Sequence, residues 1–135
     1  MRIMGLDIGD RRIGVALSDP GEILASPFTI IERNDEEHDI GTITDIITQR
    51  EVGTIIVGLP RSMAGTIGHQ AAKVEAFVER LRSHTQIPIE FRDERLSTVS
   101  ARQLLQHTGR KTKKKPRYDA AAAAVILQDY LEERL

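Results

Sequence analysis

The hydrophobic residues of the first twenty positions follow strand spacing. Arg2–Leu6 is a short, largely apolar run that ends at Asp7, and Ile13, Val15 and Leu17 then recur at every second position. The turn between them carries Gly9. Two apolar segments joined by a short glycine-bearing turn predict a β-hairpin.

A third strand is predicted over residues 23–32, with Leu24, Phe28 and Ile30 on one face. Pro27 lies inside this segment. Proline has no backbone N–H to donate to a neighbouring strand, so its presence favours a place at the edge of the sheet.

The rest of the chain alternates helices and strands. Helices are expected over residues 37–50, 68–83, 97–106 and 116–135, strands over 54–58 and 87–91, and loops over 60–68 and 108–115. Three meandering strands followed by helix-connected strands predict an α/β fold: a mixed five-stranded sheet with helices on its faces. No repeat or linker interrupts residues 1–135, so we expect one domain.

Composition narrows the chemistry. The chain has no cysteine, so any metal must be held by oxygen or imidazole. No apolar run is long enough to cross a bilayer, and the acid and glycines near the N-terminus do not fit a signal peptide. We therefore expect a cytoplasmic protein without a membrane partner.

Charge is unevenly distributed although the net charge is only -1. Residues 110–117 hold six basic side chains, and residues 35–39 hold four acids. A solvated loop is the favoured interpretation of the acidic run. For the basic run, a solvated loop and a phosphate-binding segment are about equally favoured, because dense positive charge binds nucleic acid by releasing counterions.

Acidic residues occur where predicted strands end and where the last helix begins. They are Asp7, the pair Asp93–Glu94, and Asp119, which precedes five alanines. Each has an ordinary alternative: a turn aspartate, a salt-bridged surface turn, and a carboxylate favoured by the helix dipole. The alanines suggest instead a helix that packs closely on the sheet and brings Asp119 to the strand ends.

Three carboxylates from remote segments suit metal-dependent phosphodiester chemistry. Mg²⁺ and Mn²⁺ prefer oxygen ligands, and two ions held by shared carboxylates activate water and stabilise the departing oxygen. No serine has an evident catalytic partner. The loop after residue 58 and the first hairpin add possible phosphate donors, among them Arg11, Arg12, Arg61 and Ser62. A plain connection is an equally good interpretation of that loop. The histidines lack metal-ligand spacing.

Four blocks of the sequence resemble the YqgF/RuvX family in order. They are GLDIGDRRIGVALSD, IIVGLPRSMAGTIG, DERLSTVSA and KKKPRYDAAAAAVILQDYL, and the likeness covers nearly the whole chain. The resemblance implies an RNase H-like fold related to the RuvC resolvases. It also implies either a nuclease that processes the 5′ end of pre-16S rRNA or a Holliday junction resolvase.

The resemblance further implies that Asp7, Glu94 and Asp119 are the catalytic, metal-binding set for Mg²⁺ or Mn²⁺, with Asp93 a less certain ligand. Ala64 departs from the polar or acidic residue common in the family. The expected nucleic-acid contacts are Arg11, Arg12, Arg61, Ser62, Arg95, Arg110, Lys111, Lys113, Lys114 and Lys115.

Three classes of function remain open from the sequence. The first is the metal-dependent nuclease, acting on structured RNA or on branched DNA, as a monomer or a homodimer. The second is a nucleic-acid-binding module without catalysis. The third is an actin-like phosphotransfer domain, which would need a second, similar half that we do not expect in a chain of 135 residues.

Overall fold

The computed structural model describes residues 1–59, 69–93 and 116–134, and at residues 69 and 116–119 the backbone alone. The strands are β1 (Arg2–Ile8), β2 (Arg12–Ser18), β3 (Ala25–Glu32), β4 (Val52–Leu59) and β5 (Ile89–Asp93). The helices are α1 (Glu36–Arg50), α2 (His69–Arg82) and α4 (Pro116–Glu133). The predicted helix over 97–106, the loop over 60–68 and the basic loop lie outside the described residues.

The five strands form one sheet in the order β3-β2-β1-β4-β5. β1 is antiparallel to β2 and parallel to β4, and β4 is parallel to β5. The predicted mixed sheet is confirmed, and β3 lies at its edge as Pro27 indicated.

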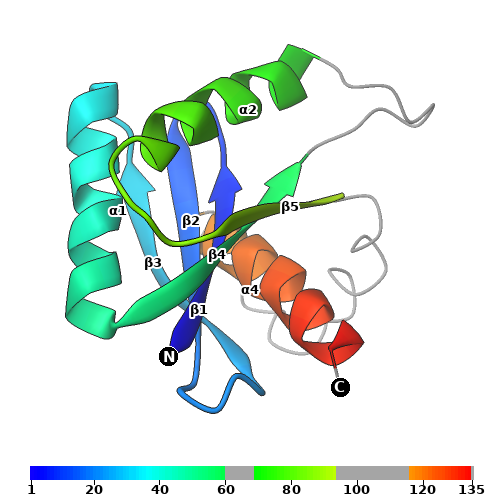
Figure 1. Ribbon diagram of the computed structural model, residues 1–135. Helices are drawn as coiled ribbons and strands as arrows, with labels where there is room; N and C mark the ends of the chain where they lie inside the picture. The colour runs from blue at the N-terminus through cyan, green and yellow to red at the C-terminus, as the bar shows by residue number, and fades with distance from the viewer. Residues whose placement is uncertain (60–68, 94–115, 135) are drawn as a thin grey trace.

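Helices cover both faces of this sheet (Figure 1). On one face, α1 and α2 pack over a core that includes Met4, Leu6, Ile43 and Phe77. On the other face, α4 packs on a smaller core in which Ala123, Ala124 and Leu127 meet Ile3, Ala16 and Ile56. The alanine-rich segment is therefore a buried helix, as its composition predicted.

The close approach of α4 depends on Gly5 at the middle of β1. A Cβ atom placed on Gly5 would lie 2.9 Å from the carbonyl oxygen of Ala123 and 2.9 Å from Cβ of Leu127. Real Cβ atoms do not approach backbone so closely, so any side chain here must push α4 away from the sheet. Glycine at this position sets the spacing between the helix and β1.

The acidic run forms the cap and the first turn of α1 rather than a solvated loop, so that interpretation was wrong. Asp35 caps α1 by accepting a hydrogen bond from the backbone N–H of His38, and Glu36, Glu37 and Asp39 occupy the first turn. Carboxylates are favoured there because the helix N-terminus carries a partial positive charge. Asp39 is fully buried.

The expected face of the third strand was also wrong. Leu24 precedes β3 and is exposed. The pairing of β2 with β3 shifts between Val15, which faces Thr29, and Ala16, which faces Pro27, so Phe28 is the extra residue of a bulge. Phe28 therefore lies under the guanidinium of Arg50 on α1, while Ile30 pairs with Gly14.

Among the described residues no helix combines the length and the apolarity needed to cross a membrane.

The loop between β2 and β3 is organised by Asp19. Its Oδ1 accepts hydrogen bonds from the N–H groups of Leu24 at 2.7 Å and Ile23 at 2.8 Å, and its Oδ2 accepts one from Gly21 at 3.0 Å. The bonds from Leu24, and next those from Ile23, hold the pKa of Asp19 below its ordinary value. The ionised carboxylate therefore stabilises the hairpin.

Gly5→Ala should lower the free energy of unfolding by about 1–3 kcal/mol, because the added methyl group displaces α4. Chemical denaturation measures the change. Gly41→Ala is the matched control, since Gly41 lies in α1 with nothing within 4 Å of an added Cβ. It should stabilise the protein by about 0.5–1 kcal/mol through helix propensity. Equal effects of the two changes would contradict the close-approach argument.

Asp19→Asn should remove a pH-dependent contribution to stability. A carboxylate whose pKa is lowered by folding stabilises the native state above the unfolded pKa, and this contribution is lost as pH falls through the folded pKa. The stability difference between wild type and Asp19→Asn should therefore be constant above about pH 5 and shrink below about pH 4. Urea unfolding of both proteins, repeated at several pH values across this range, measures the stability difference. A difference that does not change with pH would refute this role.

Candidate nucleic-acid cleavage site

Strand alternation assigns each side chain of β1 to one face of the sheet. Met4, Leu6 and Ile8 belong to the core under α1 and α2. Gly5 meets α4 on the opposite face, so Asp7, two residues later, faces the α4 side as well. Asp7 is partly buried and is the penultimate residue of β1, which extends to Ile8.

Glycines surround Asp7 on that face. In β2 its direct partner is Gly14. In β4, Leu6 pairs with Val57, so the next row of the sheet brings Gly58 beside Asp7. Gly5 is the preceding residue on the same face of β1. None of these three neighbours has a side chain, and glycine in a strand often marks a place where a ligand or another backbone approaches closely.

The direction of α4 follows from its contacts. Leu127 packs at Gly5, in the middle of β1. Further along the helix, the Gln128 side chain accepts a hydrogen bond from the N–H of Ala25 at 2.8 Å, and Arg134 pairs with Glu22 at 2.9 Å. Ala25 is opposite Ser18, whose Oγ accepts from the N–H of Ile3 near the start of β1. These contacts place the end of the helix toward the start of β1, and its first turns therefore lie toward the other end of that strand.

Asp119 lies one helical turn before Ala123, which meets Gly5. The turn that carries Asp119 therefore lies before the contact with Gly5 along the helix, on the same face of the sheet as Asp7, although the Asp119 side chain lies outside the described residues.

The end of β5 lies two strands away from β1, at the same level along the sheet as Asp7. Gly58 pairs with Arg92, and Leu59 pairs with Asp93. Arg92 therefore shares the face of Asp7, whereas Asp93 shares the face of Leu59, which belongs to the core under α1 and α2. Asp93 is the last residue of β5 and partly buried, so this strand runs farther than the predicted 87–91.

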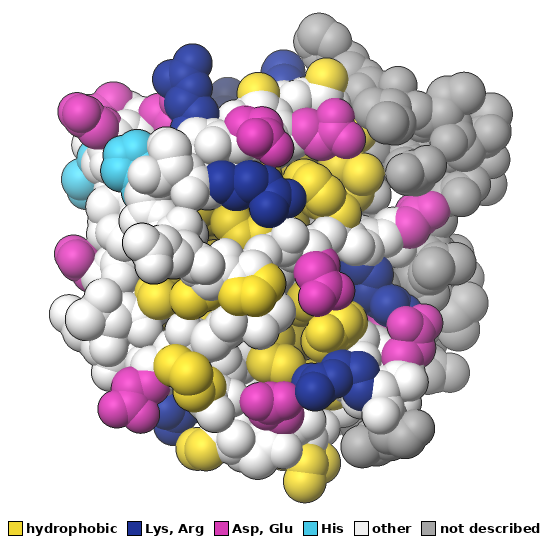
Figure 2. Space-filling model, viewed as in Figure 1, with side chains coloured by type: hydrophobic (Ala, Val, Ile, Leu, Met, Phe, Trp, Pro, Cys, Tyr) yellow, Lys and Arg dark blue, Asp and Glu magenta, His cyan; other side chains and the backbone are white. Residues whose placement is uncertain are grey.

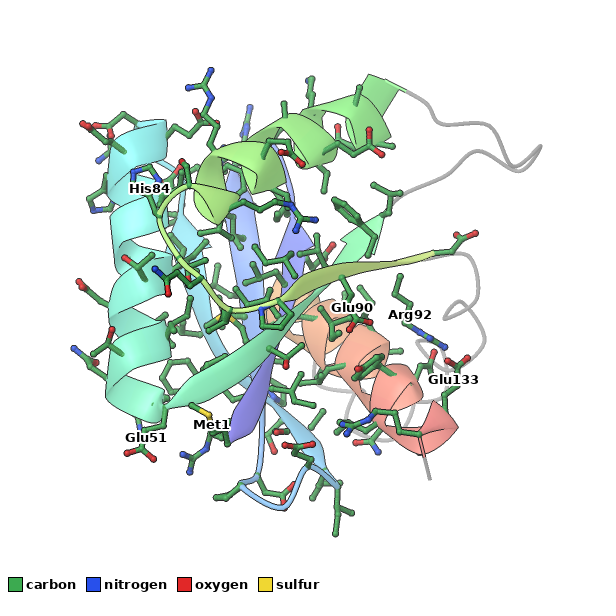
Figure 3. All side chains as sticks on the ribbon, viewed as in Figure 1. Met1, Glu51, His84, Glu90, Arg92 and Glu133 are labelled. Carbon is green, nitrogen blue, oxygen red and sulfur yellow. The ribbon has the colours of Figure 1, made fainter. Side chains whose placement is uncertain are left out.

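Arg92 connects β5 to α4. Its Nη1 and Nη2 each donate to a carboxylate oxygen of Glu133 at 2.8 Å, and Figure 3 shows the two side chains pointing toward one another. The side chain of Arg92 is only 13% exposed. The bidentate bond raises the pKa of Arg92 and lowers that of Glu133. No local pattern in the sequence indicates this pair, because its partners are 41 residues apart.

The two arginines of the first hairpin differ in placement. Arg11 is exposed in the turn between β1 and β2. Arg12 begins β2 and is partly buried. Because Ile13 faces the other core, alternation puts Arg12 on the face of Asp7. Positive charge thus lies within the rows next to the carboxylate.

The other predicted site residues lie outside the described part of the chain: Glu94, Arg61, Ser62, Arg95, Arg110, Lys111, Lys113, Lys114 and Lys115. Within residues 1–59, 69–93 and 116–134, no three Asp, Glu or His side chains gather to hold a metal ion. On the described part of the face in Figure 2, acidic and basic side chains are interspersed. This mixture accords with the net charge of -1.

Comparison with known sequences gives relatives along almost the whole chain. A protein of Desulforamulus reducens named "Putative pre-16S rRNA nuclease" is 47% identical over 133 residues, which are 98% of this chain and 97% of that protein. A protein of the same name from Thermoanaerobacter pseudethanolicus is 47% identical over 136 residues, covering 99% and 98% of the two chains.

Solved structures share the fold. RuvC of T. thermophilus in complex with a Holliday junction substrate matches with a TM-score of 0.68 and 12% identity, over 99% of this chain and 95% of that chain. The Fowlpox virus resolvase bound to junction DNA matches with a TM-score of 0.59 and 15% identity, over 100% and 99%. At such identities the likeness establishes the RNase H-like, RuvC-like fold and nothing further.

The model of one family, described as RuvX, Holliday junction resolvase, matches residues 1–133. The four motif blocks lie within that span, and the relatives at 47% identity extend over the same region. The chain therefore belongs to the RuvX family.

Proposed function

We propose that this protein is a metal-dependent endonuclease that hydrolyses phosphodiester bonds in the 5′-end processing of pre-16S rRNA. The observation that carries the proposal is Asp7 in its glycine-lined row, on the face of the sheet where α4, the helix that bears Asp119, packs closely on β1. Two carboxylates from elements remote in the sequence thus belong to the same side of the sheet. The names of the relatives support the reaction and the substrate.

The donor set fits a hard divalent cation. Carboxylate oxygen is the ligand that Mg²⁺ and Mn²⁺ prefer, and both ions retain waters that need the space left by Gly14 and Gly58. When bound, such ions supply an activated water and stabilise charge on the departing oxygen. In this proposal Asp7, Glu94 and Asp119 hold the ions, and Arg12 contributes positive charge on the same face.

The alternation of side chains between the two faces of β5 favours Glu94 over Asp93 as the second ligand. Asp93 is on the same face of the sheet as its partner Leu59, which is the face opposite to that of Asp7. Glu94 is the next residue, so in an extended chain it has the parity of Arg92 and of Asp7. We therefore assign the metal-binding role to Glu94.

Branched DNA is the second candidate substrate. The family description and the two matching structures name Holliday junctions or junction DNA. The metal chemistry is the same for both substrates, so the groove around the site decides between them. Resolution of a junction requires two symmetric cuts and favours a homodimer, whereas end processing needs one copy. A cytoplasmic location is part of the rRNA proposal.

Asp7→Asn should reduce the cleavage rate by about a hundredfold or more. Losing a metal ligand should lower activity at least as much as losing a group that only orients a ligand. The assay uses Mn²⁺ with precursor 16S rRNA and, in parallel, a four-way DNA junction. Asp45→Asn is the control, since Asp45 is an exposed carboxylate on α1. Wild-type protein that binds RNA tightly yet cuts neither substrate would identify a binding module instead.

Glu94→Gln should reduce cleavage as strongly as Asp7→Asn does, and Asp93→Asn should reduce it less. The physical reason is the opposite parity of the two positions. The two variants are compared at equal folded fraction, measured by circular dichroism, and by titration of Mn²⁺ binding. If Asp93→Asn is the more damaging variant in both measurements, the assignment of Glu94 is wrong.

A further inference from the structure

Asp39 is a fully buried carboxylate that the proposed cleavage chemistry does not use. Burying an ionised carboxylate is costly unless charged and polar partners surround it. Here Arg33 Nε donates to its Oδ2 at 3.2 Å, and the backbone N–H of Asn34 donates to its Oδ1 at 3.0 Å. His38 Nδ1 lies 3.5 Å from the same Oδ1. The first turn of α1 adds its dipole.

Arg33 extends this buried pair to the turn that follows Asp7. Its Nη1 donates to the carbonyl oxygen of Gly9 at 2.9 Å, and its own backbone N–H donates to the carbonyl oxygen of Arg11, also at 2.9 Å. Arg33 thus contacts two of the three peptide carbonyls of residues 9–11. Nothing in the cleavage chemistry requires these contacts, but they hold the backbone of the β1–β2 turn, which carries Arg11.

A third support comes from α2. The guanidinium of Arg33 lies over the ring of Phe77, 5.0 Å from its centroid. In Figure 1, α2 lies across the ends of β1 and β2, where this turn is found. Phe77 is itself fully buried, so the platform is rigid. The planar guanidinium is therefore fixed by a carboxylate on one edge and by a ring on one face.

The turn itself has little freedom. The N–H of Gly9 donates to the carbonyl oxygen of Arg12 at 2.8 Å, and a Cβ on Gly9 would lie 3.0 Å from that oxygen. Arg11 is exposed at the tip, and its backbone is held by the bonds from Arg33 to the carbonyl oxygen of Gly9 and to the carbonyl oxygen of Arg11 itself. A fixed starting point reduces the entropy lost when a side chain binds a phosphate.

We infer that Arg33, anchored by Asp39 and Phe77, is a positioning residue of the nuclease that fixes the β1–β2 turn so that Arg11 binds a substrate phosphate. This inference rests on the proposed function. Arg33 itself touches no substrate. Its effect is on substrate affinity, because the turn carries Arg11, whereas Asp7 is held separately by its pairing with Gly14.

Arg33→Lys is the sharpest variant. Lysine keeps the positive charge that Asp39 needs, but a single ammonium cannot bond Asp39 and the Gly9 carbonyl in the planar fork that arginine provides. We expect KM to rise about three- to tenfold with kcat unchanged, the factor that corresponds to weakening one phosphate contact. A purely structural role would instead lower the active fraction, and therefore kcat, without moving KM.

Arg50→Lys is the matched control. Arg50 also stacks on an aromatic ring, that of Phe28 at 4.9 Å, but on α1 and without a side-chain bond to the turn. It should leave KM and kcat as in wild type. Phe77→Leu provides a second route if Arg33→Lys folds poorly. It removes the ring under the guanidinium and should raise KM in the same direction.

A double-mutant cycle that combines Arg33→Lys with Arg11→Ala tests whether Arg33 changes KM through Arg11. If Arg33 acts through Arg11, the double variant should have the KM of Arg11→Ala alone, because the two changes remove the same contact. Each single variant should also lower the dependence of binding on salt, by about one unit of slope for Arg11→Ala. If the KM increases of the two single variants instead multiply in the double variant, the inference is wrong.

Binding is measured beside cleavage, by fluorescence anisotropy of the labelled precursor RNA or four-way junction in Ca²⁺. If wild type cuts one of these substrates and Arg33→Lys has wild-type KM and Kd, the inference alone is wrong. If wild type binds but does not cut, a rise in Kd for Arg33→Lys still supports positioning, and the nuclease proposal fails. If wild type neither cuts nor binds, both fail.

Discussion

The close contact between α4 and the backbone of β1 is the constraint on which the rest of the structure depends. Gly5 has no side chain, so Ala123 and Leu127 pack directly on the strand. Two residues farther along β1, the strand neighbours of Asp7 are Gly14 and Gly58, which likewise have no side chains. Glycine therefore admits the helix at Gly5, and in the proposed function the glycines beside Asp7 border the bound ion.

The two sides of the sheet have separate tasks. The face under α1 and α2 is a continuous apolar core, and its one fully buried charge, Asp39 among the described residues, is paired with Arg33. The face under α4 is thinner and carries charge at its edge: Asp7 in β1 and Arg92 in β5. The bond from Arg92 to Glu133 then ties β5 to the helix that brings Asp119. The elements that carry the proposed ligands are thus joined by packing and by one charged pair.

Within the described residues, periodicity and turn chemistry predicted the helices and strands well, because they are local properties. Pro27 correctly indicated the edge strand, and the alanine run correctly indicated a closely packed helix. Interactions between remote segments were not predictable. The burial of Asp39 depends on Arg33 in the preceding loop and on Phe77 in another helix, and Arg92 depends on Glu133. Phe28 changed face because of a bulge that strand alternation cannot anticipate. For the site, the sequence indicated which carboxylates are candidates. Only the strand register showed that Asp93 lies on the face of the sheet opposite to Asp7.

The central claim is that Asp7 holds a divalent ion which acts on a phosphodiester. The most direct measurement is the anomalous scattering of manganese in crystals of the protein with Mn²⁺ and a short RNA. We predict manganese bound by an oxygen of Asp7 at about 2.0–2.2 Å, with a second ion about 3.5–4 Å away. RNA bound at this edge of the sheet, with manganese absent from Asp7 at saturating concentration, would contradict the account.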